Sequence, residues 1–316
     1  MADLIEGKLS TGPIAKVSRS GEFQRPDSSF RGTITKDQAE AGRFHLYVSY
    51  ACPWAHRTLI ARKLKKLERY ISVSVSNAYM GENGWTFEGA DDPKYLAVIY
   101  LSCDKKYTGK ISVPVLWDKK MKGIVNNESS EIIRIFNSSF DGLTESDIDL
   151  YPFELKKEID DINDKVYQQV NNGVYKTGFA STQSAYEKAC RNLFITLDEL
   201  DQLLSKRKFL VGDKFTEADI RLFTTLIRFD PVYYGHFKCN LKRIVDYKHL
   251  HNYLKCIYQI PEVKETCHFD HIKEHYYKSH AWINPNSIVP LGPMLELESE
   301  HGRGKVEYYN KTAPLH

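Results

Sequence analysis

The first half of the chain arranges apolar and polar side chains in short runs typical of strands, with one helical run between them. Residues 44–50 are rich in β-forming side chains, and residues 71–75 alternate apolar and polar positions. Apolar side chains within 59–67 recur at the three- and four-residue spacing of a helix. A strand, a helix and a second strand in this order predict a parallel pair of strands joined by a crossover helix.

The pattern continues with a long insertion, two further strands and a helix. Several glycines and a proline interrupt residues 77–110, which we interpret as the insertion. Residues 111–117 and 123–125 have β character, and residues 131–136 have helical spacing. The side chains of 126–130 (Asn-Asn-Glu-Ser-Ser) can cap this last helix. The first half therefore predicts an α/β module with a mixed sheet.

The second half is helical throughout. The segments with helical spacing are 153–171, 182–206, 217–229, 245–259 and 270–278. Thr216 and Asp219 stand three residues apart at the start of one of them, which predicts a capping box with a structural role.

Together, these patterns divide the chain into four segments. Residues 1–42 are polar and Gly-rich and are expected to form an arm that lies over the surface or is partly disordered. Residues 43–140 form the α/β domain and residues 150–284 the all-helical domain. Residues 285–316, which contain further glycines and prolines, are expected to wrap around the body without structure of their own. A length of 316 residues also favours two domains.

Composition narrows the class of protein. Forty-four Lys and Arg against 41 Asp and Glu leave a formal charge of +3, which lacks the basic excess of nucleic-acid-binding proteins. The longest apolar run, 96–101, is far below the roughly 18 residues that span a bilayer, so no membrane association is expected. The first residues have no apolar signal core, and the six cysteines have no repeated short spacing. We therefore expect a cytoplasmic protein without disulfides.

Cys52 is the most informative residue of the sequence. It stands where the first strand ends and the helix begins, and Pro53 is of the type that the first helical turn tolerates. Unpaired backbone N–H groups and the helix dipole at that position favour a thiolate, which is a nucleophile. Because Ala55 stands where a dithiol oxidoreductase has its second cysteine, a mixed disulfide at Cys52 must be cleared by a thiol from solution. The alternative is a buried, inert cysteine.

Two further positions suit an extended peptide ligand. Pro114 within a β-like run predicts a strand edge, a bulge or a cis peptide, and it would leave the backbone of Val113 free to bind a peptide. Glu128 and Ser129 stand at a predicted helix start, where backbone N–H groups bind anions and a carboxylate can bind an ammonium group. Together they could hold an amino-acid zwitterion such as the γ-glutamyl end of glutathione. Simple helix capping is the alternative.

Tyrosine and histidine give weaker signals. The 20 tyrosines suit either a planar ligand that carries oxygen atoms or an aromatic-rich core. Cys267, His268, His271 and His275 could suggest a metal site, but the carboxylate–histidine motif of hydrolytic zinc enzymes is missing. We therefore predict no metal and no bound cofactor.

Several motifs taken together resemble one known family, the glutathionyl-hydroquinone reductases, which are the xi class of omega-like glutathione transferases. The motifs are Cys-Pro-Trp-Ala-His-Arg at 52–57, Val-Pro-Val-Leu-Trp-Asp at 113–118, Asn-Asn-Glu-Ser at 126–129, and the longer stretches 171–180, 228–240, 275–280, 283–285 and 288–292. The resemblance covers roughly residues 22–293. It implies a thioredoxin-like N-terminal domain, an all-α C-terminal domain and a homodimer.

The resemblance also implies a reaction and the residues that perform it. The substrates would be glutathione, as co-substrate, and glutathionylated hydroquinones, with Cys52 as the nucleophile. The residues that would hold glutathione are Trp85, Lys110, Val113, Glu128 and Ser129. The residues that would line the hydroquinone pocket are Tyr175, Tyr233 and Tyr276.

Three points stay open at this stage. Lys110 stands where the family is expected to have an arginine and cannot grip a carboxylate with two hydrogen bonds, so either glutathione binds more weakly or Lys110 suffices as a point charge. Tyr234 and Tyr277 are alternatives to their neighbours Tyr233 and Tyr276, because adjacent helical residues diverge by about 100°. The alternative functions are an omega-like thioltransferase or dehydroascorbate reductase, and a non-catalytic binding or regulatory protein of the same fold.

Overall fold

The computed structural model describes residues 3–10 and 16–311, which form two compact units. The first unit contains the described residues up to Lys16, Arg25–Ser146 and Thr266–Val289. The second contains Val17–Gln24, Asp147–Glu265 and the described residues from Pro290 onward. The sequence suggested contiguous domains, whereas residues 266–289 group with the first unit and residues 17–24 with the second.

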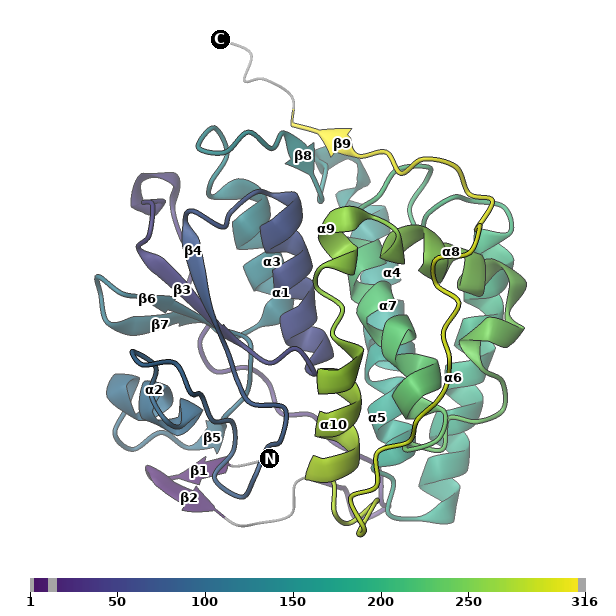
Figure 1. Cartoon of the computed structure of the whole chain (residues 1–316), viewed down its shortest axis with the longest axis horizontal. Coiled ribbons are helices and arrows are strands. Elements are labelled where there is room, and N and C mark those ends of the chain that lie inside the picture. Colours follow the sequence, from purple (N-terminus) through teal and green to yellow (C-terminus); the bar gives the residue numbers. More distant parts are fainter. Residues whose placement is uncertain (1–2, 11–15, 312–316) are drawn as a thin grey trace. The chain divides into compact units, whose positions relative to one another are not determined.

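A four-stranded mixed sheet is the centre of the first unit (Figure 1). Its strands are β3 (Phe44–Val48), β4 (Ile71–Val75), β6 (Val115–Asp118) and β7 (Gly123–Asn126). Their order across the sheet is β4-β3-β6-β7, with β3 and β4 parallel and the other two pairs antiparallel. The predicted mixed sheet and its parallel pair are thus confirmed.

Four helices accompany this sheet. They are α1 (Pro53–Leu64), α2 (Leu96–Cys103), α3 (Ser129–Ser138) and α10 (Phe269–Ser279). Helix α1 forms the predicted crossover between β3 and β4, and α3 lies beside it in Figure 1. Helix α2 was not predicted, because its apolar residues occupy all of its faces and give no amphipathic period. It occupies part of the predicted insertion and contacts β7.

The N-terminal arm contains regular structure that the sequence did not predict. Strands β1 (Asp3–Ile5) and β2 (Lys8–Ser10) form an antiparallel hairpin, and β1 also pairs with β5 (Gly109–Lys110). The hairpin turn places Glu6 and Gly7 at positive φ. A Cβ atom on Gly7 would lie 2.1 Å from the carbonyl oxygen of Lys105, so only glycine fits there. The sequence analysis predicted no strands in this arm, which it expected to lie over the surface or to be partly disordered; residues 3–10 form a hairpin, and residues 11–15 lie outside the described part.

The second unit is built from helices. They are α4 (Lys156–Val166), α5 (Gly173–Gly178), α6 (Gln183–Leu204), α7 (Glu217–Arg228), α8 (Lys248–Tyr258) and α9 (Pro261–Lys264). The predicted segment 153–171 divides into a 3-10 turn, α4 and a π-helical turn over Tyr167–Asn171, and a second π-helical turn covers Phe229–Tyr233. The extension after 285 is not wholly irregular, because β9 (Tyr309–Asn310) pairs with β8 (Ile148–Asp149).

The predicted capping box at the start of α7 is confirmed. The buried Asp219 carboxylate accepts hydrogen bonds from the Thr216 N–H (2.9 Å), the Leu210 N–H (3.0 Å) and the Tyr253 hydroxyl (2.7 Å). Burial raises the pKa of Asp219 to about 6, although these donors favour the carboxylate. Asp219 therefore ties together the start of α7, the preceding loop and α8.

Candidate active site

Cys52 lies at the start of α1, as the sequence predicted. It is the N-cap residue of this 12-residue helix, with Pro53 at the first helical position, and its carbonyl accepts the first helical hydrogen bond from the N–H of His56 (2.9 Å). Its thiol is half-buried and donates to the carbonyl oxygen of Val113, with an Sγ–O distance of 3.5 Å. Cys52 thus occupies the N-cap position of the helix, where the helix dipole favours a thiolate, although its side chain makes no capping hydrogen bond to the first turn.

The Val113–Pro114 bond directly precedes β6 and is a cis peptide. Of the alternatives that the sequence allowed, the structure therefore has the cis form. The Tyr100 hydroxyl of α2 fixes this loop by donating to the carbonyl of Ser112 (2.8 Å). Val113 consequently lies within hydrogen-bonding distance of Cys52, and its role in binding a peptide stays a prediction.

Glu128 is the N-cap of α3, so the capping interpretation is confirmed for it. Its carboxylate accepts hydrogen bonds from the backbone N–H (3.0 Å) and hydroxyl (2.8 Å) of Ser130 and from the hydroxyl of Ser28 (3.0 Å). Burial opposes ionisation, but these bonds and the charge of Arg57 lower the pKa of Glu128 below its ordinary value. The carboxylate is therefore ionised at neutral pH and suited to an ammonium group, although that role is still a prediction.

Arg57 and Trp54 were missed by the sequence analysis. The almost fully buried Arg57 guanidinium lies 4.5 Å from the centre of the Trp54 ring and 3.4 Å from the hydroxyl of the buried Ser129. The guanidinium of Arg25 lies 4.7 Å from the same ring. The sequence feature that could have indicated Arg57 is its position three residues after Trp54. Residues at this spacing lie on the same face of a helix, where an arginine can stack on an aromatic ring.

Lys110 adds a further positive charge in β5. Burial, with a smaller contribution from the charge of Arg25, lowers the pKa of Lys110 to about 8, and Asp3 of the neighbouring strand β1 opposes the shift. At neutral pH the amine is still largely protonated, and its role toward a glutathione carboxylate stays a prediction. Arg25 and Arg57 therefore place positive charge at Trp54 near the start of α1, and Lys110 is close enough to Arg25 to feel its charge.

Trp85 and Tyr276 are brought together by His275 of α10. The His275 ring is stacked on Trp85 with 4.8 Å between ring centres, and it meets Tyr276 edge-on at 5.2 Å. Its Nδ1 lies 3.0 Å from the carbonyl oxygen of Ala78. Tyr276 is buried, whereas Tyr277 is only half-buried. Nothing in these contacts tests which of the two tyrosines binds a ligand.

Tyr175 and Tyr233 lie together in the second unit, with 6.0 Å between their ring centres. Both side chains are buried, and Tyr234 is half-buried. The phenylalanines that surround this pair are Phe23, Phe179, Phe229 and Phe237. The hydroxyl-bearing rings therefore occupy an apolar aromatic cluster, which we call the tyrosine cluster.

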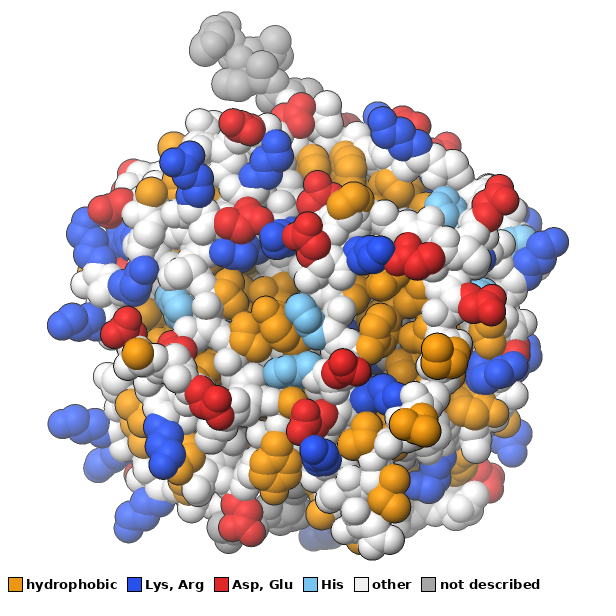
Figure 2. All heavy atoms as spheres, viewed as in Figure 1, with side chains coloured by type: hydrophobic (Ala, Val, Ile, Leu, Met, Phe, Trp, Pro, Cys, Tyr) orange, Lys and Arg blue, Asp and Glu red, His pale blue; other side chains and the backbone are white. Residues whose placement is uncertain are grey.

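The histidines near Cys267 are used for packing and hydrogen bonding. His268 stacks on Tyr50 with 3.6 Å between ring centres, and His56 contacts the Thr266 hydroxyl at 2.8 Å and the Cys267 sulfur at 3.9 Å. Within residues 3–10 and 16–311, no three His, Cys, Asp or Glu side chains are arranged to hold a metal ion. In the same residues, no helix combines the length and apolarity needed to cross a bilayer. Acidic and basic side chains are interspersed over the face drawn in Figure 2.

Comparison with known proteins agrees with this geometry. Residues 51–139 match the N-terminal domain family of glutathione S-transferases, and residues 183–256 match the C-terminal domain family. The mixed sheet with its helices and the following helical segment thus correspond to the two domains of this family. The chain belongs to the glutathione S-transferase family.

Individual relatives define the group within that family. The chain is 50% identical to the glutathionyl-hydroquinone reductase YqjG of Escherichia coli, over 96% of this chain and 98% of that protein. It is 51% identical to the glutathionyl-hydroquinone reductase PcpF of Sphingobium chlorophenolicum, over 93% and 96%. The crystal structure of the xi glutathione S-transferase from Phanerochaete chrysosporium superposes with a TM-score of 0.86 at 51% identity, covering 88% of this chain and 95% of that one. The glutathione-bound structure of YqjG gives a TM-score of 0.85, covering 87% and 96%. Sequence and fold thus group the chain with the xi-class transferases and glutathionyl-hydroquinone reductases.

Proposed function

We propose that the protein reduces S-glutathionyl-hydroquinones to hydroquinones with glutathione as co-substrate. The observation that carries this proposal is Cys52 at the N-terminus of α1, with Ala55 in place of a second cysteine. Two relatives at 50% and 51% identity bear the name of this activity, which supports the choice of substrate.

In the first step, the Cys52 thiolate attacks the sulfur atom of the glutathionyl-hydroquinone. A bond forms between the two sulfur atoms, and the bond between sulfur and the ring carbon breaks. The carbon takes up a proton and leaves as the hydroquinone, so the ring is reduced and Cys52 is oxidised to a mixed disulfide with glutathione.

A ring carbon is a poor leaving group unless its negative charge is stabilised. The hydroquinone can tautomerise to a keto form in which the carbon next to the carbonyl bears the sulfur, so that its oxygen carries the developing charge. Tyrosine hydroxyls that donate to the ring oxygens stabilise that charge and assist the proton transfer. We assign this role to Tyr175, Tyr233 and Tyr276.

In the second step, a glutathione molecule from solution attacks the mixed disulfide. Its thiol forms a disulfide with the bound glutathione and leaves Cys52 as a thiolate. The two glutathione sulfurs thus provide the two electrons that the hydroquinone ring receives. Because Ala55 cannot supply a resolving thiol, this step depends on external glutathione.

Glutathione would be held by polar groups of the first unit. We propose that Glu128 accepts a hydrogen bond from the α-ammonium group and that Ser129 and the start of α3 bind the neighbouring carboxylate. The backbone of Val113 would bind the peptide, beside the Cys52 sulfur. Lys110 would attract the other carboxylate, and Trp85 would pack against the tripeptide.

A direct assay tests this function. The purified protein is mixed with a glutathionyl-hydroquinone and glutathione, and hydroquinone and oxidised glutathione are quantified. We expect equal amounts of the two products. Turnover of disulfides or dehydroascorbate without hydroquinone formation would favour the omega-like thioltransferase, and binding of glutathione without any turnover would favour a non-catalytic protein.

We also propose a cytoplasmic homodimer. All six cysteines are thiols and not disulfides, which supports a reducing compartment. Sedimentation equilibrium tests the assembly: the expected mass is twice 36.5 kDa, and a mass of one chain at micromolar concentration would contradict it.

A further inference from the structure

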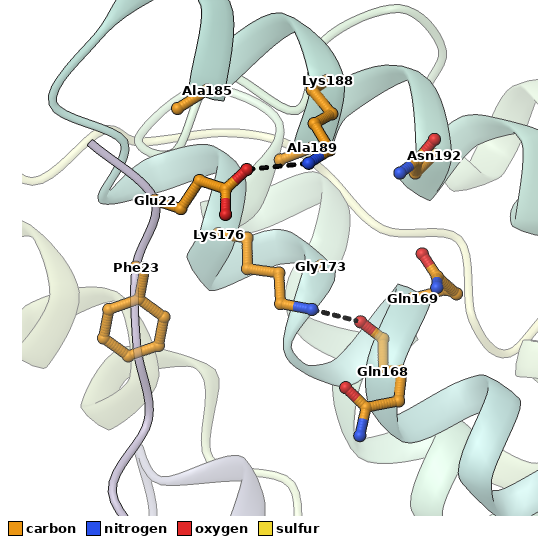
Figure 3. A pocket seen from close by; sticks show the side chains of 10 residues that line it. All are labelled: Glu22, Phe23, Gln168, Gln169, Gly173, Lys176, Ala185, Lys188, Ala189 and Asn192. Atoms are coloured by element: carbon orange, nitrogen blue, oxygen red, sulfur yellow. Dashed lines mark hydrogen bonds and ion pairs between the residues drawn. The ribbon is translucent and has the colours of Figure 1, made fainter. Parts of the chain in front are cut away.

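A cavity of about 140 Å³ lies wholly within the second unit. Figure 3 shows its lining, which comes from the segment around Glu22, the π-helical turn after α4, α5 and α6. The polar side chains that line it are Glu22, Gln168, Gln169, Lys176, Lys188 and Asn192. None of these residues has a role in the reaction proposed above.

The charges around this cavity do not cancel. Lys188 forms an ion pair with Glu22 at 2.8 Å, and each shifts the pKa of the other toward its charged form. The Lys176 amine instead donates to an uncharged group, the backbone carbonyl oxygen of Gln168, at 3.1 Å. Two lysines and one glutamate leave one net positive charge, carried by Lys176.

Lys176 is also partly removed from water. Burial lowers the pKa of Lys176; Glu22 opposes this shift, and the charge of Lys188 adds to it. A cation in this position gains free energy from an anionic ligand, because the ligand replaces the lost hydration. The amides of Gln169 and Asn192 offer further donors in the same cavity.

The lining also contains apolar side chains, which stand next to the charged ones in Figure 3. Phe23 is only 5% exposed, and its ring meets Phe179 edge-on at 5.4 Å and Tyr175 at 6.4 Å. Ala185 and Ala189 of α6 provide the remaining apolar surface. A ligand with a flat or short apolar body can therefore pack against Phe23 without displacing a flexible side chain.

The segment that carries Glu22 and Phe23 is anchored to the start of α6. The backbone N–H of Ser181 donates to the carbonyl of Gly21 (3.1 Å), and the Thr182 hydroxyl donates to the carbonyl of Ser20 (2.9 Å). Gly21 has φ of +86°, and a Cβ atom there would lie 2.7 Å from the Thr182 side chain. The backbone of the segment that carries Glu22 and Phe23 is therefore held in place by its hydrogen bonds to Ser181 and Thr182.

We propose that this cavity is a binding site for a small organic monocarboxylate. Its carboxylate would pair with Lys176 and accept hydrogen bonds from the amides, and its apolar body would pack against Phe23. One net positive charge matches a monoanion better than a phosphate dianion. The apolar wall distinguishes an organic anion from an inorganic one.

Benzoate is the probe, and benzamide is its uncharged control of nearly the same shape. Calorimetric titration of the full chain should give saturable binding of benzoate, with benzamide at least about tenfold weaker, because a hydrogen bond to a charged group is lost. K176M should weaken benzoate binding at least about tenfold. The matched control is K165M, since Lys165 is paired with Glu199 outside the cavity, and it should leave the affinity unchanged.

Three results would overturn the proposal. They are equal binding of benzoate and benzamide, unchanged benzoate affinity in K176M, and sulfate binding as tight as benzoate. If benzoate bound only at the hydroquinone site, K176M would leave its affinity unchanged, and this result would also overturn the proposal. If K176M does not fold, A189L provides an independent test: Ala189 is half-exposed, and leucine should fill the cavity and abolish binding without a change of charge.

Discussion

The two units offer their candidate residues very different surroundings. In the first unit, Cys52, Glu128 and Ser129 stand at helix starts among charged side chains and backbone groups. In the second, Tyr175 and Tyr233 lie among phenylalanine rings. The first arrangement suits the polar tripeptide that every glutathione-linked substrate shares, and the second suits an aromatic ring. Changes to Cys52, Glu128 and Ser129 should therefore impair all substrates, and changes in the tyrosine cluster should be selective.

The largest effect is expected for Cys52→Ser. The serine hydroxyl is a far weaker nucleophile than a thiolate, so turnover of every glutathione-linked substrate should fall by about three orders of magnitude or more. Glutathione affinity, measured by calorimetry, should change little. Cys103→Ser is the matched control, because the sulfur of Cys103 only accepts a hydrogen bond from Ile124. A Cys52→Ser protein with substantial activity would contradict the role of Cys52 as the nucleophile.

Asp219→Ala tests the second unit as a scaffold. Four buried donors would lose their acceptor, so the free energy of unfolding should fall by about 3 kcal/mol. Urea denaturation measures this change, while the folded fraction should keep its Cys52 reactivity. Asp246→Ala is the control, since Asp246 caps an exposed 3-10 turn, and it should be much milder. An equal loss for both variants would contradict a special role for the Asp219 network.

Tyr175→Phe tests the selectivity of the tyrosine cluster. Loss of one hydroxyl donor should lower hydroquinone formation about 10- to 100-fold, because the developing charge on the ring oxygen is less stabilised. Reduction of a simple glutathione mixed disulfide needs no such donor and should change much less. Tyr186→Phe is the control, since that hydroxyl donates to the Lys238 carbonyl. Equal losses on both substrates would favour the thioltransferase alternative.

Glu128→Gln should have the smallest effect of these changes. It should affect the binding of glutathione and not the chemical step. A neutral amide attracts the α-ammonium group less than a carboxylate does, so the KM for glutathione should rise about tenfold with kcat nearly kept. Glu131→Gln in the same helix is the control, because Glu131 pairs with Arg31. An unchanged KM would mean that Glu128 serves only as the helix cap.

The parts that could be predicted from the sequence are those with local signals. The start of α1 was predicted from Cys52 and Pro53, which stand where the β-like pattern changes to helical spacing. The start of α7 was predicted from the capping pair Thr216 and Asp219. Glu128 at a helix start was also predicted, although its cap geometry alone does not prove a ligand site. In each case, the determining residues lie within a few positions of one another.

The missed parts depend on contacts between residues far apart in the chain. The hairpin of β1 and β2 gains a partner about 100 residues later, and His56 meets Thr266 across 210 residues. The contacts of His56 with Thr266 and of Trp85 with His275 lie within the first unit, which includes α10 although its sequence pattern is that of any helix. Arg57 was overlooked because a buried arginine resembles a surface residue in the pattern until its partners, Trp54 and Ser129, are placed.

The most direct test is to look for the covalent intermediate. The protein is mixed with one equivalent of a glutathionyl-hydroquinone in the absence of free glutathione, then quenched and analysed by peptide mass spectrometry. We expect one hydroquinone released per chain and a glutathione disulfide on the peptide that contains Cys52. Hydroquinone release without that adduct, or with the adduct on a different cysteine, would contradict the account.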